Sequence, residues 1–308
     1  MENFKIPSVP GMTPEQLLKI YRIKKTQLKM LKNRGYDIES EIGILKDESN
    51  RSYDTSEQAE LFGLSYFVET YLDIMEQWNI YHRDNETEMT VSFAESMTNV
   101  YRLVEPSPDL DTYIYVRYFD GEVKKEKHRS LIKEIAPMEK QIGVYPLVDP
   151  FDQPGEEDLM PRPELIRHTI IVTEFPFELE ESLKNLRFHI EIFRWQELQF
   201  DVTEHYLVPK HRLVTGNEKD AKLDQLHISP SELPTLLTSD PISRYFGAQN
   251  GDLFIITRRP IYTTPVTFAP YYRIVKEHHA LKSVEAKGVP KRPPKKGLRL
   301  WGPGRRII

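Results

Sequence analysis

Two carboxylates and a lysine have the residue types of a metal-dependent nuclease. Pro108-Asp109 is followed by Glu122 and Lys124, the form of a PD…ExK motif, in which two carboxylates hold Mg²⁺ and a lysine assists the attacking water. The aromatic and β-branched run 112–119 between them predicts a strand. Eight extended residues span roughly 26 Å. A shared Mg²⁺ ion, however, needs an oxygen of each carboxylate within about 2 Å of the metal. We therefore expect a loop aspartate and a charged hairpin turn, and no nuclease.

The histidines do not form a metal motif. His205 and His211 flank Pro209, which breaks any helix that could place both imidazoles on one face. The chain has no cysteine, which removes disulfides, thiolate metal sites and a cysteine nucleophile. It also contains no GxSxG, no P-loop and no GxGxxG. We expect no catalytic residue, no metal, no cofactor and no small-molecule substrate.

Charge is distributed unevenly along the chain. The 308 residues include 42 basic and 47 acidic side chains, a net charge of −5. The stretch 282–308 alone has nine basic residues against Glu285, a net charge of +8. Two alternatives stay open for this basic tail, nucleic-acid binding through phosphate contacts and a Pro-rich solubilising extension. The N-terminal residues lack the apolar core of a signal peptide. No run of apolar residues reaches the roughly 18 residues that a membrane-spanning helix needs. We therefore expect an intracellular chain without membrane contact.

Periodicity predicts an α/β arrangement for the first two thirds of the chain. A helix is predicted over 13–34, because Thr13 and Gln16 form a capping box, Pro14 fits the first helical position and Gly35 supplies the stop. The other predicted helices span 56–78, 129–136 and 178–186. Alternating or apolar runs predict strands at 89–93, 112–119, 168–172 and 188–192. The six prolines within 137–165 indicate an irregular segment.

From about residue 196 the pattern indicates a small α+β module. Asp240-Pro241 and Gly247 bracket a two-turn helix with its cap, first-turn proline and terminal glycine in order. Asn250-Gly251 predicts a tight turn into a strand. We expect residues 271–275 to pair with that strand.

The C-terminal strings resemble the fifth subunit of eukaryotic nuclear RNA polymerases. FDVTEHYLVPKHRLV (200–214), LPTLLTSDPISRYFGAQNGDLFIITR (233–258) and YYRIV (271–275) follow the family's order and spacing, and the small archaeal counterpart of that subunit is similar to this module alone. YRIKKTQLKMLKNRGYDI (21–38), MTVSFA, TYIYVRYF and HTIIV extend the resemblance to the N-terminal part. Residues 47–85 and 137–165 depart from it as insertions or heavily remodelled stretches.

The resemblance implies a fold of two domains and a tail. An α/β jaw domain, nuclease-like in fold but without an active site, would span 1–197. A small α+β assembly domain would span 198–278, and a basic tail 279–308. The implied function is that of a non-catalytic polymerase subunit, anchored to the largest subunit beside neighbouring small subunits, with its jaw near downstream duplex DNA.

The resemblance and the residue types together nominate two groups of binding residues. The first would contact partner subunits and consists of His205, Pro209, His211, Arg244 and Tyr245. For the ring of Tyr245 the alternative is a place in the core of the small C-terminal module. The second would lie near DNA and consists of Pro176 in the loop after HTIIV and of Lys291, Arg292, Lys295 and Lys296 in the tail.

Two questions of identity stay open. The alternative function is a free-standing DNA-binding or transcription accessory protein that carries the same module. Insertions in a compact subunit make an origin in a large DNA virus an alternative to a cellular one. The expected location is the nucleus for a cellular protein, and a cytoplasmic viral factory or virion for a viral one.

Overall fold

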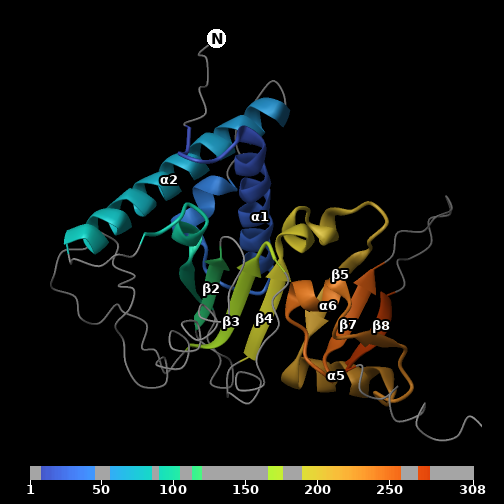
Figure 1. Cartoon of the computed structure of the whole chain (residues 1–308). Helices are drawn as coiled ribbons and strands as arrows, with labels where there is room; N and C mark the ends of the chain where they lie inside the picture. Colours follow the sequence, from blue (N-terminus) through green and yellow to red (C-terminus); the bar gives the residue numbers. More distant parts are fainter. Residues whose placement is uncertain are drawn as a thin grey trace, which may run out of the picture. The chain divides into compact units, whose positions relative to one another are not determined.

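The computed structural model describes seven stretches of the chain, residues 8–45, 56–84, 90–104, 113–119, 166–175, 189–257 and 270–277 (Figure 1). They form two compact units. The first unit takes in the described residues up to Pro209 together with Tyr245–Gly247, and the second takes in Lys210–Arg244 and the described residues from Ala248 onward. Each unit has one four-stranded sheet. None of the described helices combines the length and the apolar character that crossing a membrane requires.

Helix α1 (Pro14–Asn33) confirms the predicted first helix. The hydroxyl oxygen of Thr13 accepts from the Gln16 backbone N–H at 3.3 Å, and the Gln16 side-chain oxygen accepts from the Thr13 N–H at 2.9 Å. Gly35 follows with φ +87°, the left-handed conformation that ends helices. The predicted apolar face is buried and consists of Leu17, Ile20, Tyr21, Leu28 and Leu31.

Helix α2 (Ser56–Asp84) runs six residues beyond the predicted end at residue 78. The ring of Trp78 stacks on that of His82 one turn later, with 5.9 Å between ring centroids, an i,i+4 contact that supports the added turns. Phe67, Val68 and Tyr71 of α2 are fully buried in the first unit's core. This helix therefore supplies core residues to the unit.

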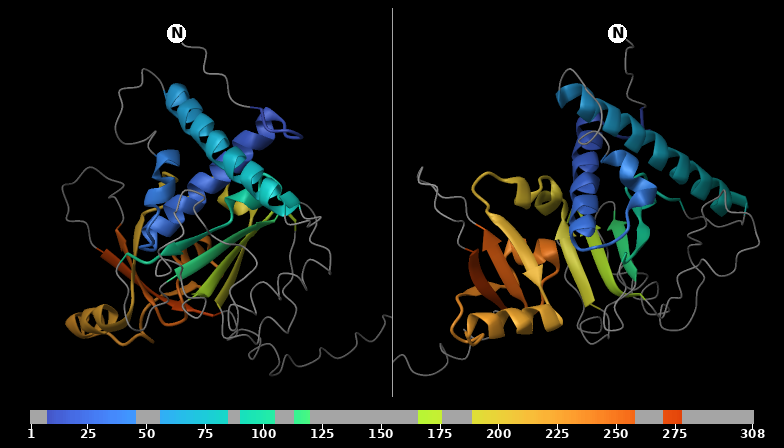
Figure 2. Two further views of the ribbon diagram at one scale, coloured as in Figure 1. Left: turned by 90° about the vertical axis from the view of Figure 1, so that its left-hand side faces the viewer. Right: turned by 180° about the vertical axis from the view of Figure 1, so that it is seen from behind.

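The sheet of the first unit is mixed and has the strand order β1-β2-β3-β4. Strand β1 (Asn99–Arg102) is antiparallel to β2 (Tyr113–Phe119), while β3 (Ile166–Thr173) is parallel to both β2 and β4 (His189–Arg194). Helices α1 and α2 cross over one face of this sheet (Figure 2). The core beneath them includes the side chains of Ile114, Val116, Tyr118, Ile170 and Val172. The strands predicted at 112–119, 168–172 and 188–192 are confirmed.

The strand predicted at 89–93 is wrong. Residues 90–94 form no strand, and a 3₁₀ helix, η3 (Glu95–Met97), precedes β1. Ser92 and Glu95 cap each other, because the Glu95 N–H donates to Ser92 Oγ at 3.2 Å and the Ser92 N–H donates to Glu95 Oε2 at 3.3 Å. Phe93 and its neighbour Ala94 are both buried. This reciprocal cap turns the chain and overrides the apparent two-residue alternation.

The second unit is a small sheet with two short helices. Its strand order is β5-β7-β8-β6, formed by β5 (Lys210–Val214), β6 (Thr235–Leu237), β7 (Leu253–Thr257) and β8 (Pro270–Lys276). The predicted pairing of β7 with β8 is confirmed, and the two strands are antiparallel, while β6 is parallel to β8. Helix α5 (Gly216–Leu226) places Leu223 in a core with Val214, Leu233, Leu253 and Ile274.

Helix α6 (Pro241–Phe246) confirms the predicted two-turn helix. The Asp240 carboxylate accepts from the Ile242 N–H at 2.9 Å, and Gly247 has φ +65° after the last turn. Together, the two units contain helices and mixed sheets, as expected. The predicted helices 129–136 and 178–186 and the irregular segment 137–165 lie outside the described residues.

Candidate functional site

Short-range hydrogen bonds close the turns of the segment 200–209. Asp201 caps the 3₁₀ helix η7 (Val202–Glu204), since its Oδ1 accepts from the Thr203 N–H at 2.8 Å and from the Thr203 hydroxyl at 2.6 Å. The Val208 N–H donates to the His205 carbonyl at 2.8 Å and closes the next turn. Each of the two turns is therefore closed by a hydrogen bond of its own.

The predicted partner-binding residues His205, Pro209 and His211 divide between the two units. His205 is exposed in the turn of the first unit, and Pro209 is half-buried at its end. His211 lies in β5 of the second unit, opposite Ile256, with its ring centroid 5.8 Å from that of Phe254. Their roles in partner binding stay predictions.

Tyr245 lies in the core of the first unit and not in the core of the small module, which was the alternative to a partner contact. Its side chain is 3% exposed. Its hydroxyl donates to Asp201 Oδ2 at 3.0 Å and accepts from Asn33 Nδ2 at 2.9 Å. Burial, with the Asp201 carboxylate adding to it, raises the pKa of Tyr245. A protonated, buried ring presents no surface to a partner here, while the neighbouring Arg244 is half-buried.

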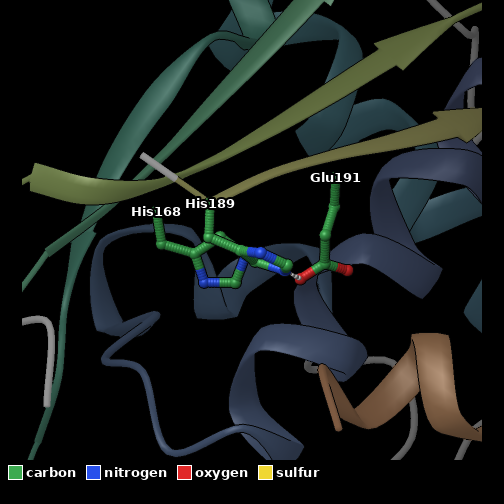
Figure 3. Close-up of side chains that lie close together, drawn as sticks. All are labelled: His168, His189 and Glu191. Carbon is green, nitrogen blue, oxygen red and sulfur yellow. Dashed lines mark hydrogen bonds and ion pairs between the residues drawn. The ribbon is translucent and has the colours of Figure 1, made fainter. Parts of the chain in front are cut away.

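A compact cluster that the sequence analysis missed joins β3, β4 and the C-terminal end of α1. His168 pairs with His189 in the parallel register of β3 and β4, and Glu191 follows two residues later on the same face. The imidazoles and the carboxylate point toward one another (Figure 3). His168 Nε2 lies 2.6 Å, and His189 Nε2 3.6 Å, from Glu191 Oε1.

Arg34, the residue that caps the C-terminal end of α1, completes this cluster. Its Nη1 and Nη2 donate to the two Glu191 oxygens at 2.9 and 2.8 Å, and its Nε donates to the Tyr245 carbonyl at 2.9 Å. Burial alone would raise the pKa of the Glu191 carboxyl, but the Arg34 guanidinium and the two histidines outweigh it and hold that pKa well below its usual range. Burial lowers the pKa of His168 despite the opposing effect of Glu191. The carboxylate is therefore charged and His168 neutral at pH 7.

The same three side chains have the donor set of a zinc site. Their ligand atoms lie within 4.8 Å of one another, and two histidines with one glutamate bind Zn²⁺ in many enzymes. Here, however, the guanidinium of Arg34 already contacts both carboxylate oxygens, and a divalent ion at Glu191 Oε1 would be repelled by it. We therefore interpret the cluster as an ion pair that ties α1 to the sheet.

A second missed feature is a buried ion pair under α1. The Lys24 side chain is 0% exposed, and its Nζ lies 3.3 Å from Glu41 Oε2 and donates to the Tyr101 hydroxyl at 2.8 Å. The hydroxyls of Tyr71 and Tyr101 both donate to the Glu41 carboxylate. Burial lowers the pKa of Lys24, against the effect of Glu41. Lys24 follows Leu17 and Tyr21 on the apolar stripe of α1, so a charge on that stripe was the available signal.

Three apolar side chains of the 200–209 segment are exposed. Phe200, Tyr206 and Leu207 are 60%, 86% and 70% exposed. Phe200 and His205 line a cavity of about 460 Å³ in the first unit, and the His205 ring centroid lies 5.0 Å from that of Tyr206. The other residues that line the cavity are Arg22, Lys25, Thr26, Lys29, Gln199, Asp201 and Glu204.

Several predicted residues lie outside the described parts of the chain. They are the DNA-proximal candidates Pro176, Lys291, Arg292, Lys295 and Lys296 and the nuclease-type residues Asp109, Glu122 and Lys124. Their roles stay predictions.

Comparison with known proteins identifies the C-terminal region. Residues 200–275 match the family described as RNA polymerase Rpb5, C-terminal domain. Over 79 residues the chain is 40% identical to "DNA-directed RNA polymerase subunit Rpo5" of Pyrococcus horikoshii, which covers 26% of this chain and 93% of the relative.

Two eukaryotic relatives show how far the similarity extends. The chain is 23% identical over 249 residues to "DNA-directed RNA polymerase subunit 5-like protein 1" of Arabidopsis thaliana, which covers 79% of this chain and 90% of the relative. It is 35% identical over 106 residues to "DNA-directed RNA polymerases I, II, and III subunit rpabc1" of Dictyostelium discoideum, which covers 33% of this chain and 54% of the relative. The family predicted from the sequence strings is confirmed, and the chain belongs to the fifth-subunit family of DNA-directed RNA polymerases.

Proposed function

We propose that this chain is a non-catalytic subunit of a multisubunit DNA-dependent RNA polymerase and anchors to its largest subunit through residues 198–278. The observation that carries the proposal is the match of residues 200–275 to the family's C-terminal domain. Archaeal relatives that carry little beyond the matched stretch bear the names of polymerase subunits. An assembly role for the C-terminal region is consistent with that pattern.

For residues 1–197 we propose a jaw domain beside downstream duplex DNA, with a nuclease-like fold but no nuclease chemistry. The mixed sheet with two helices across one face is compatible with such a fold. Strand β2 occupies the stretch between Asp109 and Glu122 along the chain, as the argument against a shared metal ion requires. Because transcription takes place where the DNA is, we propose the nucleus for a cellular protein and a viral factory or virion for a viral one.

Affinity purification of the tagged full-length chain from its native host tests the proposal. We expect the largest polymerase subunit to elute with it in equal amounts through a sizing column. Elution as a free chain of 36.2 kDa, with DNA affinity but without polymerase subunits, would instead support the free-standing accessory protein.

A further inference from the structure

One face of α1 carries a line of cationic side chains. Arg22 and Lys32 are exposed, and Lys25 and Lys29 between them are partly exposed. Their spacing of three and four residues places all four within about 80° of one another around the helix axis, along a length of about 15 Å. In a chain whose net charge is −5, this line is a local basic feature, and an anion is its electrostatic complement.

The first three of these cations line the cavity of about 460 Å³ in the first unit, together with residues of the segment 199–205. From that segment Phe200 contributes an aromatic ring and His205 an imidazole. Phe200 is 60% exposed, so the cavity is open to solvent where this residue lines it. A cavity of this size accommodates a small organic group. It therefore combines cations from the helix with an accessible aromatic ring from the segment.

The two carboxylates in the lining are already bound within the protein. Glu204 pairs with Lys29 at 2.7 Å. Asp201 accepts hydrogen bonds from the N–H and the hydroxyl of Thr203 and from the hydroxyl of Tyr245. Three cations against two carboxylates give the lining a net charge of +1 when the histidine is counted as neutral. An anionic ligand is therefore favoured over a cationic one.

A line of cations beside an exposed aromatic ring fits single-stranded nucleic acid. Proteins bind single strands by placing positive charge along the backbone and by stacking bases on aromatic side chains. A duplex keeps its base faces stacked inside and offers the ring of Phe200 no partner. The line of cations also continues to Lys32, beyond the residues that line the cavity, which suits a strand longer than one nucleotide.

We propose that this cavity binds a single strand of nucleic acid, with phosphates along Arg22, Lys25 and Lys29 and one base stacked on the ring of Phe200. The proposal goes beyond the proposed function, which concerns anchoring to the largest subunit and a place beside duplex DNA. Backbone charge and base stacking do not depend on sequence. The site therefore accepts single strands of varied sequence, of RNA and of DNA.

Fluorescence anisotropy of labelled oligonucleotides with the full-length chain tests the proposal. The probes are oligothymidylate and oligouridylate of about 12 nucleotides, within the usual site sizes for single strands, and a duplex of equal length. Arg22→Gln combined with Lys25→Gln should weaken the binding of both single strands about tenfold. It should also reduce the log–log salt slope by about 1.4, because each phosphate contact on a single strand accounts for about 0.7. Phe200→Leu should weaken single-strand binding about tenfold, with the salt slope and duplex binding unchanged, because it removes only base stacking.

Matched control variants remove the same kinds of side chain elsewhere. Lys210→Gln combined with Lys276→Gln removes two exposed cations of the second unit. Tyr81→Leu removes a ring that is 49% exposed on α2. We expect both controls to bind single strands within twofold of the unchanged chain. Every variant keeps the basic tail, so the contribution of the tail to binding is common to all of them.

Three results would overturn the proposal. The first is unchanged single-strand affinity and salt slope in both cavity variants, whose melting temperatures should match that of the unchanged chain. The second is displacement of the strand by micromolar ATP, which would assign the cavity to a free nucleotide. The third is tighter binding of a labelled oligoglutamate peptide than of either strand, which would assign it to an acidic peptide.

Photocrosslinking with an oligonucleotide that contains 4-thiouridine gives an independent readout. We expect adducts in α1 or in the segment 199–205, located by mass spectrometry of the digested full-length chain. Adducts confined to residues 282–308 would place single-strand binding in the basic tail and overturn the assignment of the cavity.

Discussion

Replacing Lys24 by methionine tests whether the buried ion pair stabilises the first unit. The ammonium is 0% exposed and lies 3.3 Å from Glu41, whose side chain is 7% exposed. Methionine keeps the length of the stem but leaves the carboxylate without its cation. Breaking a buried pair from one side costs about 3 to 5 kcal/mol. For a unit of this size that corresponds to a fall in melting temperature of about 6 to 20 °C.

Urea unfolding followed by tryptophan fluorescence measures the effect, since Trp195 lies in the same core. Glu41→Gln should cost a similar amount, because it leaves the ammonium buried without a counter-charge. The double variant should lose clearly less than the sum of the two single losses, because neither charge is then left alone. Lys25→Met is the matched control: the neighbouring lysine is only half-buried, and we expect a loss under about 1 kcal/mol. Single losses below about 1 kcal/mol, or losses that add within about 0.5 kcal/mol, would refute the reasoning.

Three further predictions concern acid stability, nuclease activity and the tail. Burial lowers the pKa of His168 from 6.5, so its stabilising contribution is complete above that pH and is lost as the pH falls through the lowered pKa. As the pH falls through this range, the melting temperature of the unchanged chain should drop more steeply than that of His168→Gln. Equal slopes of melting temperature against pH for the two proteins would contradict this. Purified protein should not cleave DNA with Mg²⁺ or Mn²⁺, and cleavage abolished in both Asp109→Ala and Glu122→Ala would overturn that expectation. The basic tail, which lies outside the described residues, should give a log–log salt slope of roughly −5 to −7 on duplex DNA, and equal slopes for the full chain and a chain ending at Leu281 would make it a passive extension.

Local signals predicted the elements whose ends are set by neighbouring residues. The capping box of Thr13 and Gln16 and the glycine after α1 act within a few residues, and the helix agrees with the predicted bounds to one residue at each end. The same holds for α6 between Asp240 and Gly247. Where two local signals competed, the stronger one prevailed: the reciprocal cap of Ser92 and Glu95 replaced the strand that alternation predicted.

Pairings between distant residues could not be predicted in the same way. Glu191 meets Arg34 across 157 positions and Glu41 meets Tyr101 across 60, and no period or cap connects such residues. A lysine on the apolar stripe of α1 indicates that a buried charge needs a partner. It does not indicate which carboxylate provides it, because that depends on how η1 (Glu39–Ile44) and β1 pack against the helix.

The two tyrosines of the matched region show why residue type alone cannot locate a binding surface. Tyrosine is favoured both in cores and in binding hot spots, since it combines a large apolar ring with one hydroxyl. The hydroxyl and the ring of Tyr245 both have partners within the chain. Asn33 and Asp201 form hydrogen bonds with the hydroxyl, and the ring is part of the hydrophobic core. Tyr206, in the same family string as His205 and Pro209, has an exposed ring on a turn that Val208 and His205 close. Residue type alone therefore predicts neither the burial of Tyr245 nor the exposure of Tyr206.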